Sequence, residues 1–230
     1  MRKTLASLAL LVACVPALGA QVVGTLPDQS PFLDLPAGQR LTVVAGWLQT
    51  GNDAVGVNAK SAPIVGARYD LAIGGPVYIT GMLFGTSTSR TILDYTKAAA
   101  HRDVGTQSFA LVDASVQLAM SLTGKRTWHR LQPLINIGAG VASGVNDAID
   151  VSGYSMGTSF QFSYGAGLRF VASHNAEFRL DLDQYWWQLK YPPLYRSTQG
   201  DPVAIKPTGS LSSWTANTAL TLGWTFYMFR

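Results

Sequence analysis

Cysteine and charge are both scarce in this chain of 230 residues. Its single cysteine, Cys14, lies in an N-terminal segment that we expect to be removed, which would leave a mature chain without thiols. Disulfides and thiolate metal sites are then excluded. Asp, Glu, Lys and Arg make up only 13% of the residues, about half the charged fraction of a soluble domain. Much of the surface is therefore expected to face something other than water.

Long hydrophobic runs are scarce as well. The one extended run, from Leu5 to Leu18, is interrupted by Pro16 and is shorter than the roughly 20 residues that a membrane-spanning helix requires. The chain instead has 23 glycines together with many Thr, Ser, Tyr and Trp residues, a composition that favours strands and turns. Low charge without spanning helices is typical of a membrane β-barrel.

Residues 1–20 have the layout of a secretory signal peptide. Arg2 and Lys3 precede the apolar run, and the sequence ALGA at 17–20 offers small residues for cleavage. We therefore expect the mature chain to begin at Gln21, with a formal net charge that falls from +4 to +2. Nothing in this charge balance suggests a nucleic-acid partner.

A second interpretation of this segment stays open. The sequence LVAC at 11–14 fits the four-residue lipoprotein pattern, in which Cys14 would be acylated and would become the first residue. The apolar run continues past Cys14, however, and a spanning barrel gains little from a lipid anchor. Cleavage of an ordinary signal peptide is the interpretation that we prefer.

The last twenty residues predict a strand with one apolar face. That face consists of Trp214, Ala216, Leu220, Leu222, Trp224, Phe226 and Met228. Such a strand suits lipid on one side and polar groups on the other, although a soluble sheet can alternate in the same way. The chain closes in a motif of one polar residue, one glycine and two hydrophobic residues, namely Thr221, Gly223, Phe226 and Met228. This motif resembles the C-terminal insertion signal of outer-membrane β-barrels.

Alternation of apolar and polar residues predicts eight strands in all. They span residues 41–49, 63–73, 77–86, 108–123, 131–142, 158–172, 177–191 and 211–230. The segment 77–86 does not favour either face. In the segment 177–191 the alternation changes phase near Gln184, which predicts a bulge or emergence above the membrane at that point.

Short and long connections alternate along the chain. The short ones are 74–76, 124–130 and 173–175, and the long ones are 51–60, 87–107, 144–157 and 192–210. Outer-membrane barrels have short periplasmic turns and long external loops, so this order predicts that both termini lie in the periplasm. Residues 21–38, which contain three prolines, are expected to form an extended periplasmic lead-in.

Together these features resemble the small eight-stranded outer-membrane barrels of the OmpA or OmpX type. The resemblance extends over residues 39–230 and includes GAG sequences at 138–140 and 165–167 in the wall. It implies an all-β fold, an eight-stranded antiparallel up-and-down transmembrane β-barrel in the outer membrane of a Gram-negative bacterium. It also implies insertion by the barrel-insertion machinery, and we expect a monomer.

The chain departs from this family in two ways. It ends in Phe229-Arg230 where a terminal Phe is usual, and Met228 sets the outward register. No domain follows the last strand, so the peptidoglycan-binding role of the larger family members is not expected here.

Several charged residues are predicted on the inward faces of the strands. They are Arg68, Asp70, Asp113, Arg169, Glu177, Arg179, Asp181 and Asp183. An eight-stranded barrel is just wide enough for side chains to fill its interior, so a diffusion pore is not expected. Paired charges would plug the lumen and fix the strand register. A proton or ion path gated by the carboxylates is the alternative, and no spacing in the sequence distinguishes the two.

Aromatic residues gather near the outer end of the seventh predicted strand. They are Tyr185, Trp186, Trp187, Tyr191 and Tyr195. Such residues commonly form the aromatic girdle at the membrane interface. The alternative is a platform on which lipid chains or sugar rings stack at the barrel mouth. The platform requires that the phase change near Gln184 aims the rings at a cavity.

Catalysis has one weak candidate. His101 stands near Asp103 in a long external loop and could orient against Ser89 or Ser108, since a serine nucleophile needs a base and an orienting acid. The pair His-x-Asp arises readily by chance in a polar loop. The other two histidines fall in predicted short turns, where solvated side chains are ordinary. We therefore expect no enzymatic activity, no metal site and no cofactor.

Cations on the predicted external loops suit the phosphates of lipopolysaccharide, although ordinary solvated charge explains them as well. They are Arg90, Lys97, Arg102, Lys190, Arg196 and Lys206. A second basic cluster, in the short connection 124–130, has no evident partner.

The preferred hypothesis is a non-enzymatic integral outer-membrane barrel with a plugged lumen. Its role would be envelope structure, adhesion or surface interaction, with outer-membrane lipids and lipopolysaccharide as its surroundings. The first alternative is a binder or conduit for a small hydrophobic molecule or lipid. The second is a lipid-modifying outer-membrane enzyme that uses His101.

Overall fold

The computed structural model describes residues 30–35, 38–94, 96–173, 176–196, 205–206 and 208–229. Residues 32–230 form one compact unit, and residues 1–31 are a separate unit. The expected signal peptide, Cys14 and most of the expected lead-in lie outside the described residues, as do His174 and Arg230.

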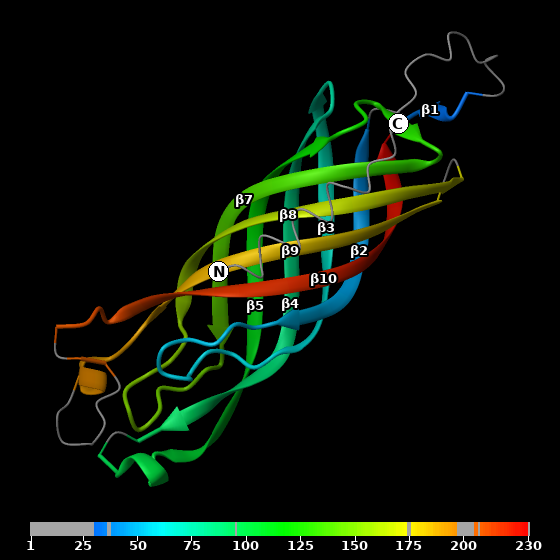
Figure 1. Ribbon diagram of the computed structural model, residues 1–230. Coiled ribbons are helices and arrows are strands. Elements are labelled where there is room, and N and C mark those ends of the chain that lie inside the picture. Colours follow the sequence, from blue (N-terminus) through cyan, green and yellow to red (C-terminus); the bar gives the residue numbers. More distant parts are fainter. Residues whose placement is uncertain are drawn as a thin grey trace, which may run out of the picture. The chain divides into compact units, whose positions relative to one another are not determined.

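Eight antiparallel strands close into a barrel (Figure 1). They are β2 (Gln39–Gln49), β3 (Ala62–Gly74), β4 (Val77–Leu93), β5 (Asp103–Ser121), β7 (Leu131–Val145), β8 (Thr158–Ser173), β9 (Ala176–Lys190) and β10 (Ser212–Phe229). Each strand pairs with the next along the chain, and β10 pairs with β2 to complete the circle. The predicted fold class is confirmed. No helix in the described part of the chain is long and apolar enough to span a membrane.

The barrel wall is apolar on its outer face and largely polar inside. Val65 and Leu222 point outward and are each 66% exposed, whereas Gln117 and Thr221 point inward and are each 1% exposed. Successive side chains of a strand point to opposite faces, so one alternating sequence supplies both surfaces. This arrangement suits lipid outside and satisfied polar groups inside, as in transmembrane barrels.

Strand β4 differs from its prediction in length and in clarity of face. It continues to Leu93, and β5 begins already at Asp103, so the predicted loop 87–107 is much shorter. Its inward residues include Tyr78, Met82 and Phe84, each at most 4% exposed. The segment 77–86 looked ambiguous because apolar side chains occupy both of its faces.

Strand β9 does not change phase. Its register with β10 runs without interruption from Glu177 to Lys190, and its inward residues remain the odd-numbered ones throughout. The predicted bulge near Gln184 was therefore wrong. What changes at that point is the lumen, where the inward side chains pass from charged Asp183 to aromatic Tyr185.

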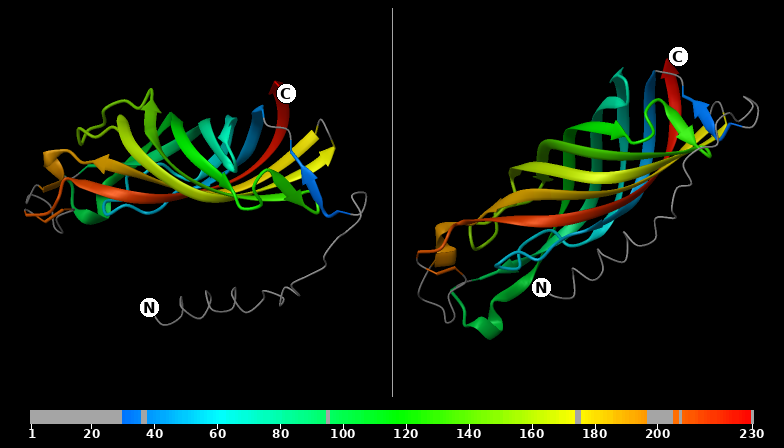
Figure 2. Two further views of the ribbon diagram at one scale, coloured as in Figure 1. Left: turned by 90° about the horizontal axis from the view of Figure 1, so that it is seen from above. Right: turned by 45° about the horizontal axis from the view of Figure 1, so that its top comes forward.

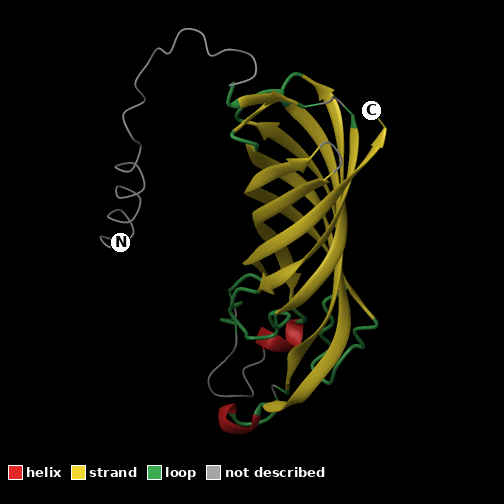
Figure 3. Cartoon of the chain, turned by 90° about the vertical axis from the view of Figure 1, so that its right-hand side faces the viewer, coloured by secondary structure: helices red, strands yellow, loops and turns green. Residues whose placement is uncertain are grey.

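Short turns and long loops lie at opposite ends of the barrel. The connections β3 to β4, β5 to β7 and β8 to β9 share one end with the C-terminal end of β10, which we call the turn end. The two short 3-10 helices, η2 (Ala99–His101) and η3 (Pro193–Arg196), lie at the other end, the loop end (Figure 3). At the turn end, β1 (Phe32–Asp34) pairs with β6 (Arg126–Trp128) beside the closed barrel (Figure 2).

Candidate functional site

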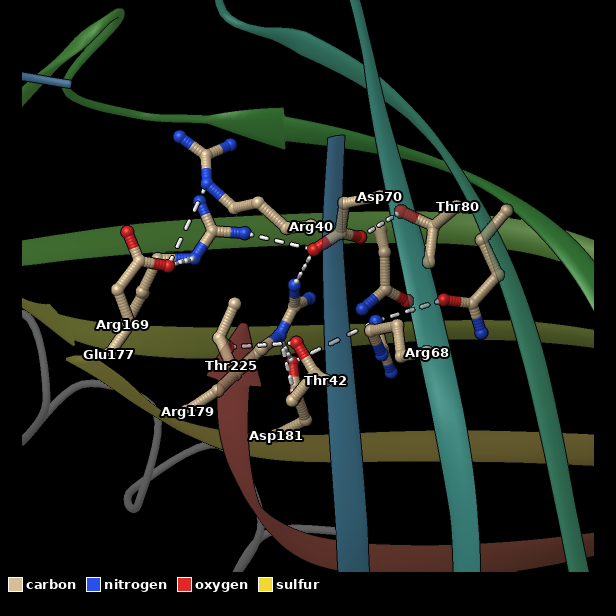
Figure 4. A network of polar contacts seen from close by, with 12 residues as sticks. Arg40, Thr42, Arg68, Asp70, Thr80, Arg169, Glu177, Arg179, Asp181 and Thr225 are labelled. Atoms are coloured by element: carbon tan, nitrogen blue, oxygen red, sulfur yellow. Dashed lines mark hydrogen bonds and ion pairs between the residues drawn. The ribbon is translucent and has the colours of Figure 1, made fainter. Parts of the chain in front are cut away.

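Eight buried charges cross the lumen at the turn end and form what we call the charged layer. Figure 4 labels all of them except Asp183. Four arginines alternate with four carboxylates, and consecutive members are ion-paired. In order they are Arg40, Glu177, Arg169, Asp70, Arg179, Asp181, Arg68 and Asp183. Each side chain is at most 1% exposed. Because the positive and negative charges balance, the layer avoids the large penalty of an unpaired charge in a low-dielectric interior.

Asp70 on β3 is the centre of the charged layer. Its Oδ2 accepts hydrogen bonds from Arg169 Nη2 at 3.0 Å and from Arg179 Nη1 at 2.8 Å. Its Oδ1 accepts a hydrogen bond from Thr80 Oγ1 at 2.6 Å. Arg179 Nε also donates to Asp181 Oδ2 at 2.7 Å. These contacts join β3 to β8 and β9 across the lumen, in addition to the hydrogen bonds along the sheet.

Two glycines make room for the carboxylates of the charged layer. Gly165 and Gly167 on β8 are the register partners of Asp183 and Asp181 on β9. A Cβ atom on Gly165 would lie 2.1 Å from Asp183 Oδ1, and one on Gly167 would lie 2.2 Å from Asp181 Oδ1. The GAG sequence at 165–167 is therefore explained by a close approach that only glycine permits.

Arg40 is a member of the charged layer that the sequence prediction missed, because the predicted strand began at Leu41. Its Nε lies 3.7 Å from Glu177 Oε2, and its guanidinium lies 5.5 Å from the ring centroids of Tyr78 and Tyr227. Extending the alternation of the strand by one residue would have found it, since Arg40 shares the inward face with Thr42.

Asp113 is the one predicted lumen charge that stands outside the charged layer. It is fully buried on β5. Its Oδ1 accepts a long hydrogen bond of 3.4 Å from Gln161 Nε2, and its Oδ2 has no partner among the described residues. In the described part of the chain no Arg or Lys forms an ion pair with it. Asp113 is thus a buried carboxylate without a counter-ion.

Above Asp113, toward the loop end, hydrophobic side chains fill the lumen and form what we call the apolar layer. Its members on the wall include Leu48, Ile64, Phe84, Leu111, Tyr185, Trp187 and Leu189. Trp187 is fully buried and donates from Nε1 to Asn58 Oδ1 in the first long loop at 3.3 Å. Phe84 and Tyr185 meet edge to face, with ring centroids 5.3 Å apart.

The predicted aromatic cluster is divided between the inside and the outside of the barrel. Tyr185, Trp187, Tyr191 and Tyr195 are at most 5% exposed and belong to the packed interior, so they are not part of a girdle. Only Trp186 lies on the outer wall, where it stacks on Phe162 with ring centroids 5.9 Å apart. Because the strand keeps its phase, alternate residues of one aromatic run serve opposite faces.

Three tyrosines from two external loops cover the apolar layer. Tyr154, Tyr191 and Tyr195 have ring centroids 5.8 to 6.3 Å apart. The hydroxyl of Tyr191 donates to Asp53 Oδ2 in the first loop at 2.9 Å, and the hydroxyl of Tyr195 lies 3.0 Å from Ser152 Oγ. We call this group the loop cap. It closes the lumen at the loop end.

Arg90 holds the loop 146–157 in place. Its Nε lies 3.0 Å from both carboxylate oxygens of Asp147, and its Nη1 lies 2.5 Å from Asp150 Oδ2. Its Nη2 donates to the carbonyl oxygens of Ala148 and Tyr154. The expectation that Arg90 faces outward as a loop cation was wrong, because β4 continues past Thr86 and turns this side chain inward, where it is fully buried.

The catalytic candidate is not assembled. His101 and Asp103 are both exposed, and Asp103 Oδ1 accepts from the backbone N of Gly105 at 3.0 Å. Among the described residues no hydrogen bond joins the His101 ring to Asp103 or to either candidate serine. Ser89 and Ser108 are register partners on β4 and β5. No group of three or more potential metal ligands occurs in the described part of the chain.

The residues of the insertion motif lie on both faces of β10. Phe226 and Met228 are each 49% exposed on the outer wall, whereas Thr221 is 1% exposed in the lumen. A Cβ atom on Gly223 would lie 2.5 Å from Thr42 Cγ2 of β2. The glycine therefore permits close packing where β10 and β2 close the barrel.

No protein-family model and no curated protein sequence matches the chain. Solved structures do, and we name three. The outer membrane protein OprG of Pseudomonas aeruginosa is 11% identical, with 84% of this chain and 98% of that chain covered and a TM-score of 0.46. Neisserial surface protein A is 12% identical, with 86% and 98% covered and a TM-score of 0.42. The outer membrane enzyme PagL is 13% identical, with 82% and 99% covered and a TM-score of 0.38. These similarities concern the fold alone.

Proposed function

We propose that this protein is an integral outer-membrane barrel that anchors and presents its external loops, without a channel and without a catalytic step. One observation carries the proposal, namely that paired charges cross the lumen at the turn end and that buried hydrophobic and aromatic side chains pack it toward the loop end. Eight strands leave an interior just wide enough for such side chains. A barrel filled in this way serves as a membrane scaffold and not as a diffusion pore.

The loop 146–157 is the best candidate for surface interaction. Arg90 donates hydrogen bonds to two backbone carbonyl oxygens of this loop. Ile149 and Val151 of the same loop are 74% and 69% exposed. Apolar side chains on a backbone that is already ordered lose little conformational entropy when a partner binds. This geometry supports adhesion or another surface contact.

Lipopolysaccharide is the proposed neighbour of the loop end. Lys97, Lys190 and Lys206 are exposed at that end, and their ammonium groups suit anionic phosphates. The short turns and the ends of β2 and β10 would then lie in the periplasm, as in other outer-membrane barrels.

The small-molecule alternative receives less support, because the aromatic rings that could have formed a ligand platform pack against one another and against Asn58. The enzyme alternative lacks an assembled triad at His101. Neither alternative is favoured by a specific contact.

The proposal is tested by recording conductance and by mapping the topology. Purified full-length protein in planar bilayers should show no channel steps. A short epitope inserted after Ile149 should bind antibody on intact expressing cells, whereas the same epitope inserted at Gly75 in the β3 to β4 turn should bind only after the membrane is opened. Stable ohmic channels in the unmodified protein, or the reverse pattern of labelling, would contradict the proposal.

A further inference from the structure

An apolar groove of about 470 Å³ lies on the outer wall near the turn end. Its lining includes Val43 and Ala45 on β2, Phe170 on β8, Phe178 on β9, and Leu222 and Trp224 on β10. The rings of Phe178 and Trp224 meet edge to face, with centroids 4.7 Å apart. The chemistry of the groove suits a hydrocarbon chain, because its lining is almost wholly apolar.

A cation, Arg130, lies at the edge of this groove that is nearest the turn end. Leu131 is the register partner of Phe170, so Arg130 directly precedes the wall residue beside the groove. The carbonyl oxygen of Arg130 accepts a hydrogen bond from Val171 N at 2.9 Å. The Nη1 of Arg130 donates a hydrogen bond to the carbonyl oxygen of Ala172, also at 2.9 Å. Arg130 is exposed and forms no ion pair with any described residue. Its remaining guanidinium donors are available to an anion.

The neighbouring residues strengthen the positive character of this turn. Lys125 and His129 are exposed as well. Arg126 is neutralised by Asp34, with Nε and Oδ1 2.8 Å apart. The net positive charge of this connection is therefore carried by Lys125, which precedes β6, and by Arg130, which follows it.

The pair of strands β1 and β6 lies at the turn end of the barrel (Figure 2) and carries two exposed aromatic residues. Trp128 is the register partner of Leu131, and Phe32 is the register partner of Trp128. Directly opposed residues share a face of the sheet, so all three side chains lie on the lipid-facing side. Trp128 is 51% exposed and Phe32 is 47% exposed. Such residues favour the headgroup level of a membrane.

The conformation of the turn between β6 and β7 is unusual. His129 and Arg130 have φ of 49° and 66°, and two successive positive values are normally supplied by Asn-Gly or Asp-Gly in a two-residue hairpin. Non-glycine residues in this region are disfavoured by sterics. The turn nevertheless places the guanidinium-bearing Arg130 next to Leu131, the register partner of the groove residue Phe170.

We propose that the turn end binds one anionic phospholipid of the periplasmic leaflet, with its phosphate on Arg130, an acyl chain in the groove, and Lys125 adding positive charge to the same connection. A guanidinium binds phosphate oxygens through two parallel donors, and the groove accepts the chain that is attached to that phosphate. This inference goes beyond the anchoring role, which needs no bound lipid.

Native mass spectrometry of the full-length protein in detergent tests the proposal. Phosphatidylglycerol should bind more tightly than phosphatidylcholine with the same acyl chains. Replacing Arg130→Gln and Lys125→Gln should weaken phosphatidylglycerol binding by about fivefold for each cation removed. Phosphatidylcholine binding should weaken less, because its choline cation already offsets the charge of its phosphate. Phe170→Ala should weaken the binding of both lipids, because it removes part of the groove.

Lys190→Gln at the loop end is the matched control and should bind phosphatidylglycerol as the unmodified protein does. Every variant is first checked for the faster migration of its unboiled form on a denaturing gel, so that a misfolded barrel is not mistaken for lost binding. Equal binding of the two lipids, or an unchanged preference in the Arg130→Gln, Lys125→Gln variant, would overturn the proposal. So would full competition by glycerol phosphate, since that molecule has no chain for the groove.

Discussion

At the scale of single residues, the charged layer depends on glycines as much as on charges. Gly165 and Gly167 leave the space that Asp183 and Asp181 occupy. A methyl group at either glycine would displace the neighbouring carboxylate. Arg68 or Arg179 would then be buried with a weakened ion pair, so the substitution would destabilise the charged layer as well as the backbone.

We therefore predict that Gly165→Ala lowers the free energy of unfolding by about 3 to 5 kcal/mol, the range for breaking a buried ion pair. Gly81→Ala is the matched control, since a Cβ atom there would meet nothing within 4 Å, and it should be neutral or slightly stabilising. Urea unfolding of both variants in lipid vesicles measures the difference. Equal stability of the two would show that Asp183 moves without consequence.

A second prediction contrasts two buried aspartates. Asp70→Asn should destabilise the barrel by about 3 to 5 kcal/mol, because Arg169 and Arg179 both lose a charged partner. Asp113→Asn should be neutral or stabilising, because it replaces a buried carboxyl group that has no counter-ion among the described residues and adds a donor near Gln161. The same unfolding assay compares them. A large loss of stability in Asp113→Asn would mean that its carboxylate holds a partner of its own.

At the scale of elements, the strands were predictable and the contents of the lumen were not. Alternation predicted the barrel strands except β4, whose segment 77–86 did not favour either face, because one face of each strand meets lipid and lipid imposes the same apolar requirement along the whole wall. The inward face has no such uniform requirement. It is charged at Asp183 and aromatic at Tyr185, so an inward apolar run was mistaken for a change of phase.

The loop cap and the role of Arg90 were beyond prediction for a different reason. Arg90 is on β4, whereas Asp147 and Asp150 are almost sixty residues later in an irregular loop. Loops have no period that places their side chains, so a contact between a strand and a distant loop leaves no pattern in the sequence.

The loop 146–157 should respond to acid before the barrel does. Burial alone would raise the pKa of Asp150, but hydrogen bonds from Ser152 and Arg90 to the charged form outweigh it, and the pKa lies below the ordinary aspartate value. The contribution of Asp150 to stability is therefore present above about pH 3.9, the unfolded value, and is lost as the pH falls through the lower folded value.

Hydrogen exchange of the loop 146–157 between pH 5 and pH 2, corrected for the intrinsic rate, measures this effect. We expect protection at Ser152 N and Tyr154 N to fall at the acid end, because both donate to Asp150 Oδ1, while strands of the barrel stay protected. Asp150→Asn should show weaker protection at all pH values and no acid-induced loss. Loss of protection in the strands at the same pH as in the loop would contradict a local effect.

At the scale of the whole molecule, the barrel has two closures in series. The charged layer crosses the lumen at the turn end, and the apolar layer with its loop cap fills the loop end. The two resist ions for different reasons, because fixed paired charges occupy the first, whereas the second is packed mainly with hydrophobic and aromatic side chains that replace little of an ion's hydration. Opening one should leave the other in place.

We therefore predict that conductance appears only when both layers are breached. Arg179→Ala removes the residue that joins Asp70 to Asp181, and Trp187→Ala removes the largest side chain of the apolar layer, at a cost of about 3 to 5 kcal/mol for the cavity. Each single variant in planar bilayers should stay closed, whereas the combined variant should show channel steps. Channel steps in Trp187→Ala alone would mean that the charged layer does not block ions. Channel steps in Arg179→Ala alone would mean that the apolar layer does not block ions.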